Sequence, residues 1–172
     1  MRCQSLVVLL LVVMLTPLTV SATCNSNVVA TTPDSRYLDN KDGTVTDTVT
    51  GLIWKRCSEG QTWNGTTCIG TASTYTWAPA LQAGPASNFT GKSDWRLPNI
   101  NELKSIVEHQ CYAPTINLNI FPNTPSWAYW SASPVSFWPG GAWFVAFDEG
   151  YDNYTGVGNT GGIGVHLVRG GL

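Results

Sequence analysis

Charge is scarce in this sequence. Lysine and arginine together number 9, and aspartate and glutamate number 11, so the 172 residues carry a formal net charge of −2. Proteins that bind nucleic acid present a concentrated basic footprint. A mildly acidic chain therefore predicts no nucleic-acid partner. The same balance argues against simple electrostatic binding of sulfated polysaccharides.

Long hydrophobic runs are also scarce. The single continuous run, Leu6 to Leu15, is shorter than the roughly 20 residues that a membrane helix needs. Arg2 precedes it and the small residues Val20-Ser21-Ala22 follow it, as in a secretory signal peptide. We therefore expect residues 1–22 to be a signal peptide and residues 23–172 to form one domain. A single-span anchor and a lipid-anchored start at Cys24 are the alternatives.

No later hydrophobic run is long enough to cross a bilayer. We therefore expect an exported protein with no membrane span after signal cleavage, located in the periplasm, on the cell surface or outside the cell. The mature chain would lose the positive charge of Arg2 and carry −3 instead of −2.

Closely spaced cysteine pairs are missing, and the two histidines lie far apart in sequence, which disfavours a zinc site. No metal and no cofactor are predicted. Four cysteines remain after signal cleavage, and an even number in an exported protein indicates two disulfides with three possible connectivities. A bridge within the short loop would leave the outer two cysteines to tie the N-terminus to the middle of the chain. The two bridges would then be Cys57–Cys68 and Cys24–Cys111.

Local catalytic motifs are missing as well. His166 lies in an apolar last strand, where a histidine usually has a structural role. His109 follows a predicted helix, and a histidine there stabilises the C-terminal end of the helix. Asp148 and Glu149 are adjacent in a turn, so their carboxylates point apart and do not converge as a glycosidase pair does. These patterns predict a protein that is not an enzyme.

Glycine, threonine, asparagine and aromatic residues are plentiful, and they predict short strands joined by long loops. Residues 45–47 and 52–54 should form a β-hairpin around Thr50-Gly51. Residues 39–43 are interpreted as a turn, because they lack the regular oxygen ligands of a calcium loop. Further strands are expected at 129–133, 142–147, 151–155 and 165–169, and the second of these is apolar on both faces, as in a central strand.

Two helices are predicted. The first starts at residues 76–81 and is stopped by Gly84-Pro85. The second runs from Asn99 to about residue 108, with Glu102 completing a capping box and an apolar face at helical spacing. Asp94 and Arg96 precede it and are expected to pair beside Trp95. We interpret this group as scaffold: Asp94, Trp95, Arg96, Asn99 and Glu102.

Together these segments resemble the Lcl C-terminal domain, a bacterial family of unknown function named after part of a collagen-like adhesin. The stretches that carry the resemblance are DNKDGTVTDTVTGLIWKRC, WNGTTCIG, TYTWAPAL, SDWRLPNINELKSIV, INLNIFPNTP, YWSAS, AWFVAFDEGYDNY and VHLVRGG. The resemblance implies an α+β, C-type lectin-like fold, with a twisted antiparallel sheet, two short helices and long loops.

This chain departs from the family pattern in two ways. Many relatives carry cysteines where this chain has Ala83 and Leu167, so one family disulfide is absent here. The related formylglycine-generating enzyme needs copper-binding thiols, and the late part of this chain has no cysteine. The likeness therefore carries no catalysis.

Eight tryptophans supply material for a binding surface. Trp54, Trp95 and Trp143 lie in or beside regular elements and are expected in the core. In a C-type lectin-like fold the late loops and strands commonly form the ligand face, and rigid aromatic rings with Asn and Asp are typical of binding loops. The candidate ligand-binding residues are Trp127, Trp138, Asp148, Glu149, Tyr151, Asp152, Asn153 and Tyr154.

The sequence therefore predicts a secreted, non-catalytic, adhesin-like recognition module for a cell-surface glycan or protein. The alternative is a structural or assembly component of the bacterial envelope, and a homo-oligomer is compatible with either. An exposed aromatic cleft would favour binding, and a flat apolar patch would favour assembly. Converging buried carboxylates or histidines with shifted pKa values would favour an enzyme.

Overall fold

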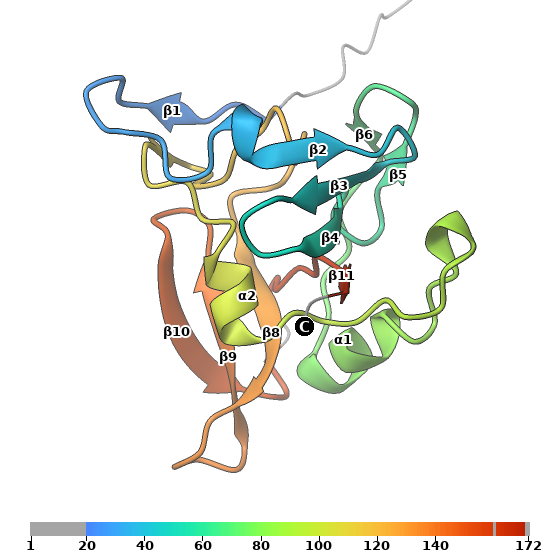
Figure 1. The fold of residues 1–172 in the computed structure, drawn as a ribbon. Helices are drawn as coiled ribbons and strands as arrows, with labels where there is room; N and C mark the ends of the chain where they lie inside the picture. The colour runs from blue at the N-terminus through green and yellow to red at the C-terminus, as the bar shows by residue number, and fades with distance from the viewer. Residues whose placement is uncertain (1–19, 160, 171–172) are drawn as a thin grey trace, which may run out of the picture.

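The computed structural model describes residues 20–159 and 161–170. Most of the predicted signal peptide lies outside these residues. The described chain is a mixed α and β structure, made mostly of antiparallel strands with two short α-helices (Figure 1). Within these residues no helix combines the length and the apolar character needed to cross a bilayer.

A four-stranded antiparallel sheet has the order β11-β4-β3-β2. Its strands are β2 (Tyr37–Asp39), β3 (Thr44–Asp47), β4 (Leu52–Lys55) and β11 (Val168–Gly170). The predicted hairpin is confirmed, with Val45 opposite Trp54 in the register of β3 and β4. Gly51, at φ +71°, closes its turn by donating to the carbonyl of Asp47. The sheet thus joins an early hairpin to a strand near the end of the chain.

The last strand is shorter than predicted. Strand β11 begins at Val168 and not at residue 165. The carbonyls of Val165 and Leu167 accept hydrogen bonds from Glu59 and Lys55 instead. These residues therefore lie beside the β4 end and the loop after it, outside the regular ladder.

A three-stranded sheet has the order β10-β9-β8, with β8 at Ala128–Pro134, β9 at Gly141–Ala146 and β10 at Tyr151–Gly156. The predicted central strand, β9, is confirmed. Tyr129 and Val145 belong to a core with α2 on one face, and Trp130 packs in a second core on the other face. Because both faces are covered, β9 is apolar on both sides.

The two α-helices are α1 (Trp77–Ala83) and α2 (Ile100–Lys104). Helix α1 ends before Gly84, as predicted. Helix α2 has the predicted capping box, in which the Asn99 side chain accepts from the Glu102 N–H and the Glu102 carboxylate accepts from the Asn99 N–H. It is shorter than predicted, because Val107 pairs with Ile116 in an isolated β-bridge and can no longer be helical.

Smaller elements carry the disulfides. Strand β1 (Thr23–Cys24) pairs with β7 (Cys111–Tyr112), and β5 (Thr62–Trp63) pairs with β6 (Cys68–Ile69). The disulfides Cys24–Cys111 and Cys57–Cys68 are both present. Of the three connectivities open to the sequence, the structure thus has the one with a short loop and a long loop, and such bonds indicate an oxidising environment.

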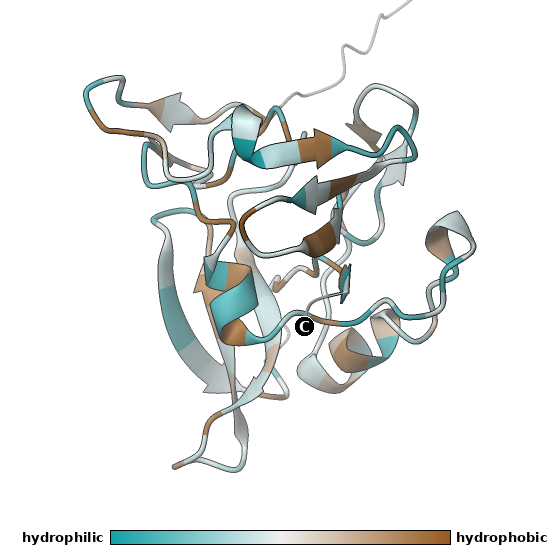
Figure 2. Ribbon diagram, viewed as in Figure 1, coloured by the Kyte–Doolittle hydropathy of each residue, from teal (hydrophilic) through white to brown (hydrophobic). Residues whose placement is uncertain are grey.

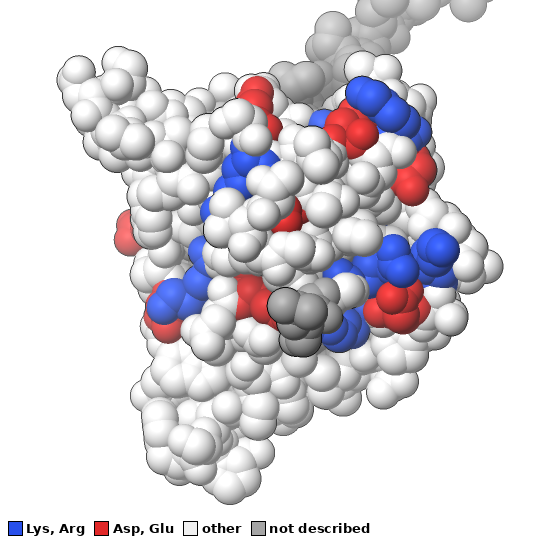
Figure 3. Space-filling model, viewed as in Figure 1, with Lys and Arg blue, Asp and Glu red and all other residues white. Residues whose placement is uncertain are grey.

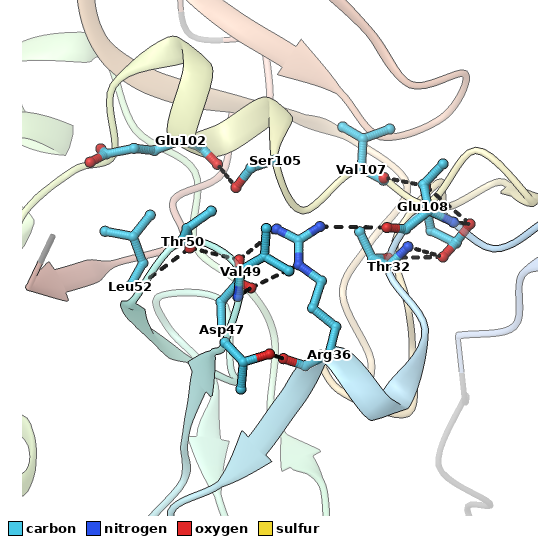
Figure 4. Close-up of polar contacts among 12 residues, drawn as sticks. Thr32, Arg36, Asp47, Val49, Thr50, Leu52, Glu102, Ser105, Val107 and Glu108 are labelled. Carbon is cyan, nitrogen blue, oxygen red and sulfur yellow. Dashed lines mark hydrogen bonds and ion pairs between the residues drawn. The ribbon is translucent and has the colours of Figure 1, made fainter.

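A polar network fastens the N-terminal segment to the hairpin and to the segment after α2. Arg36, at the end of the 3-10 helix η1 (Asp34–Arg36), points toward Asp47 and donates from Nε at 2.8 Å (Figure 4). Asp47 also accepts from the Thr50 hydroxyl at 2.7 Å. Glu108 is buried and accepts from the Thr32 N–H at 2.7 Å. Burial would raise the pKa of both carboxyls, but these donors hold each below its ordinary value.

A second 3-10 helix, η2 (Phe89–Gly91), lies between the α-helices. At the other pole of the molecule, the connection between β8 and β9 projects from the body, at the bottom of Figure 1. Hydrophobic positions lie along it (Figure 2). This projection carries the candidate site.

Candidate functional site

The predicted ligand-binding residues do not form one cluster. Trp127, Asp148 and Glu149 lie where β8 begins and β9 turns into β10, and Trp138 lies at the opposite end, in the β8–β9 connection. Six residues of β9 separate the two ends, which is roughly 17 Å at the rise of a strand. Only part of the predicted set can therefore contact one small ligand.

The register of β9 and β10 divides the set further. Tyr154 lies opposite Trp143, and Asp152 lies opposite Val145, so these four share the face that α2 covers. Tyr151 and Asn153 point to the other face, because side chains alternate along a strand. The predicted residues that meet are Trp138 and Tyr154.

Two aromatic residues that the sequence did not nominate for binding join them. The ring of Tyr154 lies 5.3 Å from that of Phe137, 5.3 Å from that of Trp143 and 6.2 Å from that of Trp138, all in edge-on arrangements. Such geometries are the favourable ones for aromatic pairs. Trp143 was expected in the core but is only partly buried, because it lies beyond the part of the sheet that α2 covers. We call Phe137, Trp138, Trp143 and Tyr154 the aromatic platform.

The platform is open to solvent. Relative exposure is 67% for Phe137, 42% for Trp138 and 40% for Tyr154. Large exposed hydrophobic groups that form a contiguous patch mark interaction sites more often than scattered ones do. The platform is such a patch, formed by two strands and the connection before them.

A pair of glycines lets Trp138 lie against the sheet. Gly141 and Gly156 are opposite each other in β9 and β10, on the same face as Trp143 and Tyr154. A Cβ on Gly141 would lie 2.4 Å from Cε3 of Trp138, and one on Gly156 would lie 3.6 Å from its Cη2. The indole therefore occupies the space that a side chain at Gly141 would need.

The platform lies in an uncharged region. No Asp, Glu, Lys or Arg occurs between Glu108 and Asp148. Figure 3 accordingly shows the lower projection of the molecule without a blue or red side chain. Asp152, two residues before Tyr154 in β10, lies on the same face and is paired with Lys104 of α2 at 2.6 Å. A ligand here would meet aromatic rings and little electrostatic field.

At the opposite end of the sheet, Trp127 is 38% exposed. Its carbonyl accepts from the Phe147 N–H at 2.9 Å, and Asp148 and Glu149 are exposed in the adjoining turn. Tyr151, which is 45% exposed, adjoins the same turn, but within the described residues neither ring is paired with another, whereas three rings of the platform gather around Tyr154.

A comparison with known protein families shows to which family this chain belongs. Residues 43–169, well over half of the chain, match the sequence model described as the Lcl C-terminal domain. The chain belongs to the Lcl C-terminal domain family. No curated protein and no solved structure was found to match it.

In this Lcl C-terminal domain the scaffold cluster holds β11 and α2 together, but its pairing differs from the prediction. Asp94 and Arg96 do not pair with each other. Asp94 accepts from Nε of Arg169 at 2.8 Å, and Arg96 makes a two-pronged contact with Glu102 at 2.7 Å for each nitrogen. The partners come from β11 and α2, because Arg96 and Val168 exchange backbone hydrogen bonds and bring those elements together.

The other residues of the cluster make contacts within the domain. Trp95 is buried and its indole N–H donates to the Phe89 carbonyl at 2.9 Å. Glu102 serves the capping box and Arg96 at once. Burial would raise the pKa of Glu102, but Arg96 and the Asn99 N–H lower it below the ordinary value. These contacts join the segment around Trp95 to α2 and β11.

The groups that an enzyme would use lie apart from the platform. His166 is completely buried, and its Nε2 lies 3.3 Å from the hydroxyls of Ser58 and Thr124. Burial, with Lys55 nearby, lowers the pKa of His166 to about 3. In the described residues no group of three or more His, Cys, Asp or Glu side chains is placed to hold a metal ion.

The hollows of the described surface also lie elsewhere. The first, of about 450 Å³, is lined by the Cys24–Cys111 bridge and polar residues such as Asp34 and Asn117. Another, of about 490 Å³, lies between α2 and the β3–β4 turn. Neither of these hollows, nor any of three others in the described part of the chain, includes a platform residue. The platform is an exposed patch on the surface of the sheet.

Proposed function

We propose that this domain is an exported, non-catalytic recognition module that binds a glycan of a cell or envelope surface through the aromatic platform. The family match indicates a module associated with bacterial surfaces and adhesins. The single observation that carries the proposal is the clustering of Phe137, Trp138, Trp143 and Tyr154 on one open, uncharged face.

Aromatic rings suit this role for two reasons. Tryptophan and tyrosine offer large contact areas at a small cost in conformational entropy, and the flat faces of the rings can stack on the C–H surfaces of a sugar. The platform is also held in place before any ligand arrives, because Trp138 rests on the glycine pair and the other rings contact Tyr154. A preorganised surface loses less free energy on binding.

We also propose a C-type lectin-like fold for the domain. Its support is the combination of two short α-helices, antiparallel sheets, long loops and a strand near the C-terminus that pairs with an early strand. Export is supported by the two disulfides, which need an oxidising compartment.

One observation favours a second function. The platform is open and lies outside the hollows of the described surface, and a flat apolar patch is typical of a protein contact. The second candidate is therefore a structural or assembly role in the bacterial envelope, with the platform covered by a protein.

A glycan array tests the first candidate. Residues 23–172 would be displayed multivalently, because weak single sites gain avidity from multivalency, and the array would be probed with calcium and again with chelator. Truncation of an aromatic anchor at the centre of a binding surface costs about 2 kcal/mol or more. We therefore expect Trp138→Ala to weaken binding at least tenfold.

Trp127→Ala is the matched control. Trp127 has nearly the same exposure as Trp138 but lies at the other end of the sheet, so its removal should leave the array signal unchanged. Equal loss in both variants would place the ligand outside the platform. A blank array with folded, disulfide-intact protein would refute the glycan proposal and favour the assembly role.

A further inference from the structure

The two main sheets of the described chain have four outer edges, and they differ in how they are protected. The β8 edge is covered by the chain around Gly164, which exchanges backbone hydrogen bonds with Ala128 and Trp130. The β11 edge is covered by Arg96, which bonds to Val168 in both directions. The β2 edge is three residues long and carries the charged Asp39. Short, covered or charged edges resist pairing with another chain.

The β10 edge is neither short nor covered by another segment of the described chain. It is six residues long, and its one charged side chain, Asp152, is already paired with Lys104 of the same chain. Within the described residues, no backbone hydrogen bond from outside β9 reaches this edge between Tyr151 and Thr155. Of the four outer edges of the two main sheets, β10 is therefore the one that is open to pairing with another strand.

The ladder register shows which backbone groups of β10 face outward. Val157 N–H donates to the Gly140 carbonyl, so this pair is hydrogen-bonded, and bonded and non-bonded pairs alternate along an antiparallel ladder. Thr155, Asn153 and Tyr151 therefore bond to β9. The N–H and C=O groups of Asp152, Tyr154 and Gly156 point away from the sheet.

One outward acceptor and one outward donor of β10 are engaged within the same chain. The Gly156 carbonyl accepts from the Asn159 N–H at 2.9 Å, although a carbonyl oxygen has a second lone pair and can accept a second hydrogen bond. The Tyr154 N–H donates to Oδ1 of Asn153 at 2.8 Å. This is an exposed contact between neighbours in sequence, and the Asn153 side chain can rotate away from it. Among the three outward residues, the middle one thus carries a removable cap.

We propose that β10 pairs with β10 of a second copy, antiparallel and centred on Tyr154. This register alone places all three outward residues of each strand within the other strand, with Tyr154 opposite its own counterpart and Asp152 opposite Gly156. A register centred on Asp152 would set two like charges side by side, which is unfavourable. The symmetric register pairs an aromatic with an aromatic and a carboxylate with the smallest residue.

The pairing would join two three-stranded sheets into one of six strands. The two-fold axis stands perpendicular to the sheet, so both aromatic platforms lie on the same face. Neighbouring strands are about 4.8 Å apart, which makes the two platforms one continuous aromatic surface. This dimer does not depend on what the platform binds, but it would give a polymeric ligand two adjacent sites and hence avidity.

Sedimentation velocity of residues 23–172 over a range of concentrations tests the pairing. Asp152→Pro removes an outward N–H while leaving every β9–β10 bond intact, since proline is tolerated on a strand edge that faces solvent. Asp152→Ala is its control, because it removes the same side chain and keeps the N–H. We expect wild type and Asp152→Ala to dimerise with dissociation constants within threefold of each other, and Asp152→Pro to raise the constant at least tenfold.

Asn153→Ala tests the cap. It frees the Tyr154 N–H in both copies of the symmetric dimer, so association should tighten about thirtyfold, as expected for two hydrogen bonds of about 1 kcal/mol each. Wild-type protein that stays monomeric up to about 1 mM would overturn the proposal, and so would an Asp152→Pro variant that dimerises as wild type does. Far-ultraviolet circular dichroism would establish that each variant is folded.

Disulfide trapping tests the register. The four cysteines of residues 23–172 are all bonded to each other, so a fifth is the only free thiol. Tyr154→Cys should cross-link two copies on mild oxidation, and Asn153→Cys should not, because residue 153 lies opposite residue 155 of the other copy. The reverse pattern would overturn the register. Glycan binding by monomeric Asp152→Pro would show the platform working without the dimer, so the two proposals can fail separately.

Discussion

The glycine pair under Trp138 makes a sharp test of how the platform is built. Gly141→Ala and Gly156→Ala are the same substitution at two positions that face each other across β9 and β10. A Cβ at residue 141 would lie 2.4 Å from Cε3 of Trp138, but a Cβ at residue 156 would lie 3.6 Å from Cη2. Carbon atoms pack best at about 3.5–4.0 Å, so only the first substitution has to move the indole, by more than about 1 Å.

The expected free energies follow from two opposing effects. Replacing glycine by alanine in a strand stabilises by about 0.5–1 kcal/mol, because the unfolded chain loses conformational freedom. Overpacking costs about 1–3 kcal/mol. Gly156→Ala should therefore be neutral or stabilising, and Gly141→Ala should destabilise by about 0.5–2 kcal/mol. Since about 1 kcal/mol shifts Tm by about 2–4 °C at this chain length, the two Tm values should differ by several degrees.

Thermal unfolding measured by calorimetry gives the Tm values, and the glycan array gives the functional consequence. Displacement of Trp138 breaks its contact with Tyr154, so Gly141→Ala should also weaken ligand binding as Trp138→Ala does. Gly156→Ala should bind as wild type. Equal Tm values and equal binding for the two variants would refute the inference that Trp138 rests on this glycine pair.

Three further predictions concern stability. Burial lowers the pKa of His166 to about 3 from an ordinary 6.5, so the unfolded state binds a proton that the folded state does not, and stability should fall by about 2 kcal/mol between pH 7 and pH 5. His166→Gln should abolish this slope in urea titrations and the exposed His109→Gln should keep it; a slope that survives in His166→Gln would contradict the assignment. Glu102→Gln should cost about 1–3 kcal/mol in chemical denaturation, because it weakens the capping box and the Arg96 contact together, and a change below about 0.5 kcal/mol would contradict that account. Replacing Cys24 and Cys111 by serine should cost about 4.5 kcal/mol, since their bridge closes a loop with a sequence separation of 87, and a cost below that of removing the other, short-loop disulfide would contradict the entropic argument.

Features that depend on neighbours in sequence were predicted well. The capping box of α2 needs Asn99 and Glu102 three residues apart, and the hairpin at Gly51 needs turn residues between two short strands. Both were found where expected. Local chemistry decides such elements, so one chain is enough to recognise them.

Features that depend on distant partners were predicted less well. Their closeness in sequence predicts that Asp94 and Arg96 pair with each other. In the structure Asp94 pairs with Arg169 of β11, and Arg96 pairs with Glu102 of α2. The apolar sequence of β9 predicts that Trp143 is in the core, yet it lies past the part of the sheet that α2 covers. Whether another element covers a strand depends on long-range packing, and the hydrophobic pattern of the strand alone does not show it.

The candidate site illustrates the same division. The sequence nominated Trp138 and Tyr154, since aromatic residues in late loops favour binding surfaces. It also nominated Trp127, which lies at the opposite end of the sheet, one length of β9 away. The run of residues without charge between Glu108 and Asp148 was the available signal for the uncharged face.

The position of the β8–β9 projection has a practical consequence for orientation. The described chain begins near β1, at the pole of the molecule opposite the projection (Figure 1). Residue 20 is fixed there by a hydrogen bond from Val20 N–H to the Asn123 side chain. A linker, label or support attached at the start of the described chain would hold the molecule at the pole opposite the projection and leave the four aromatic rings facing outward. The same attachment at the β8–β9 connection would bury them.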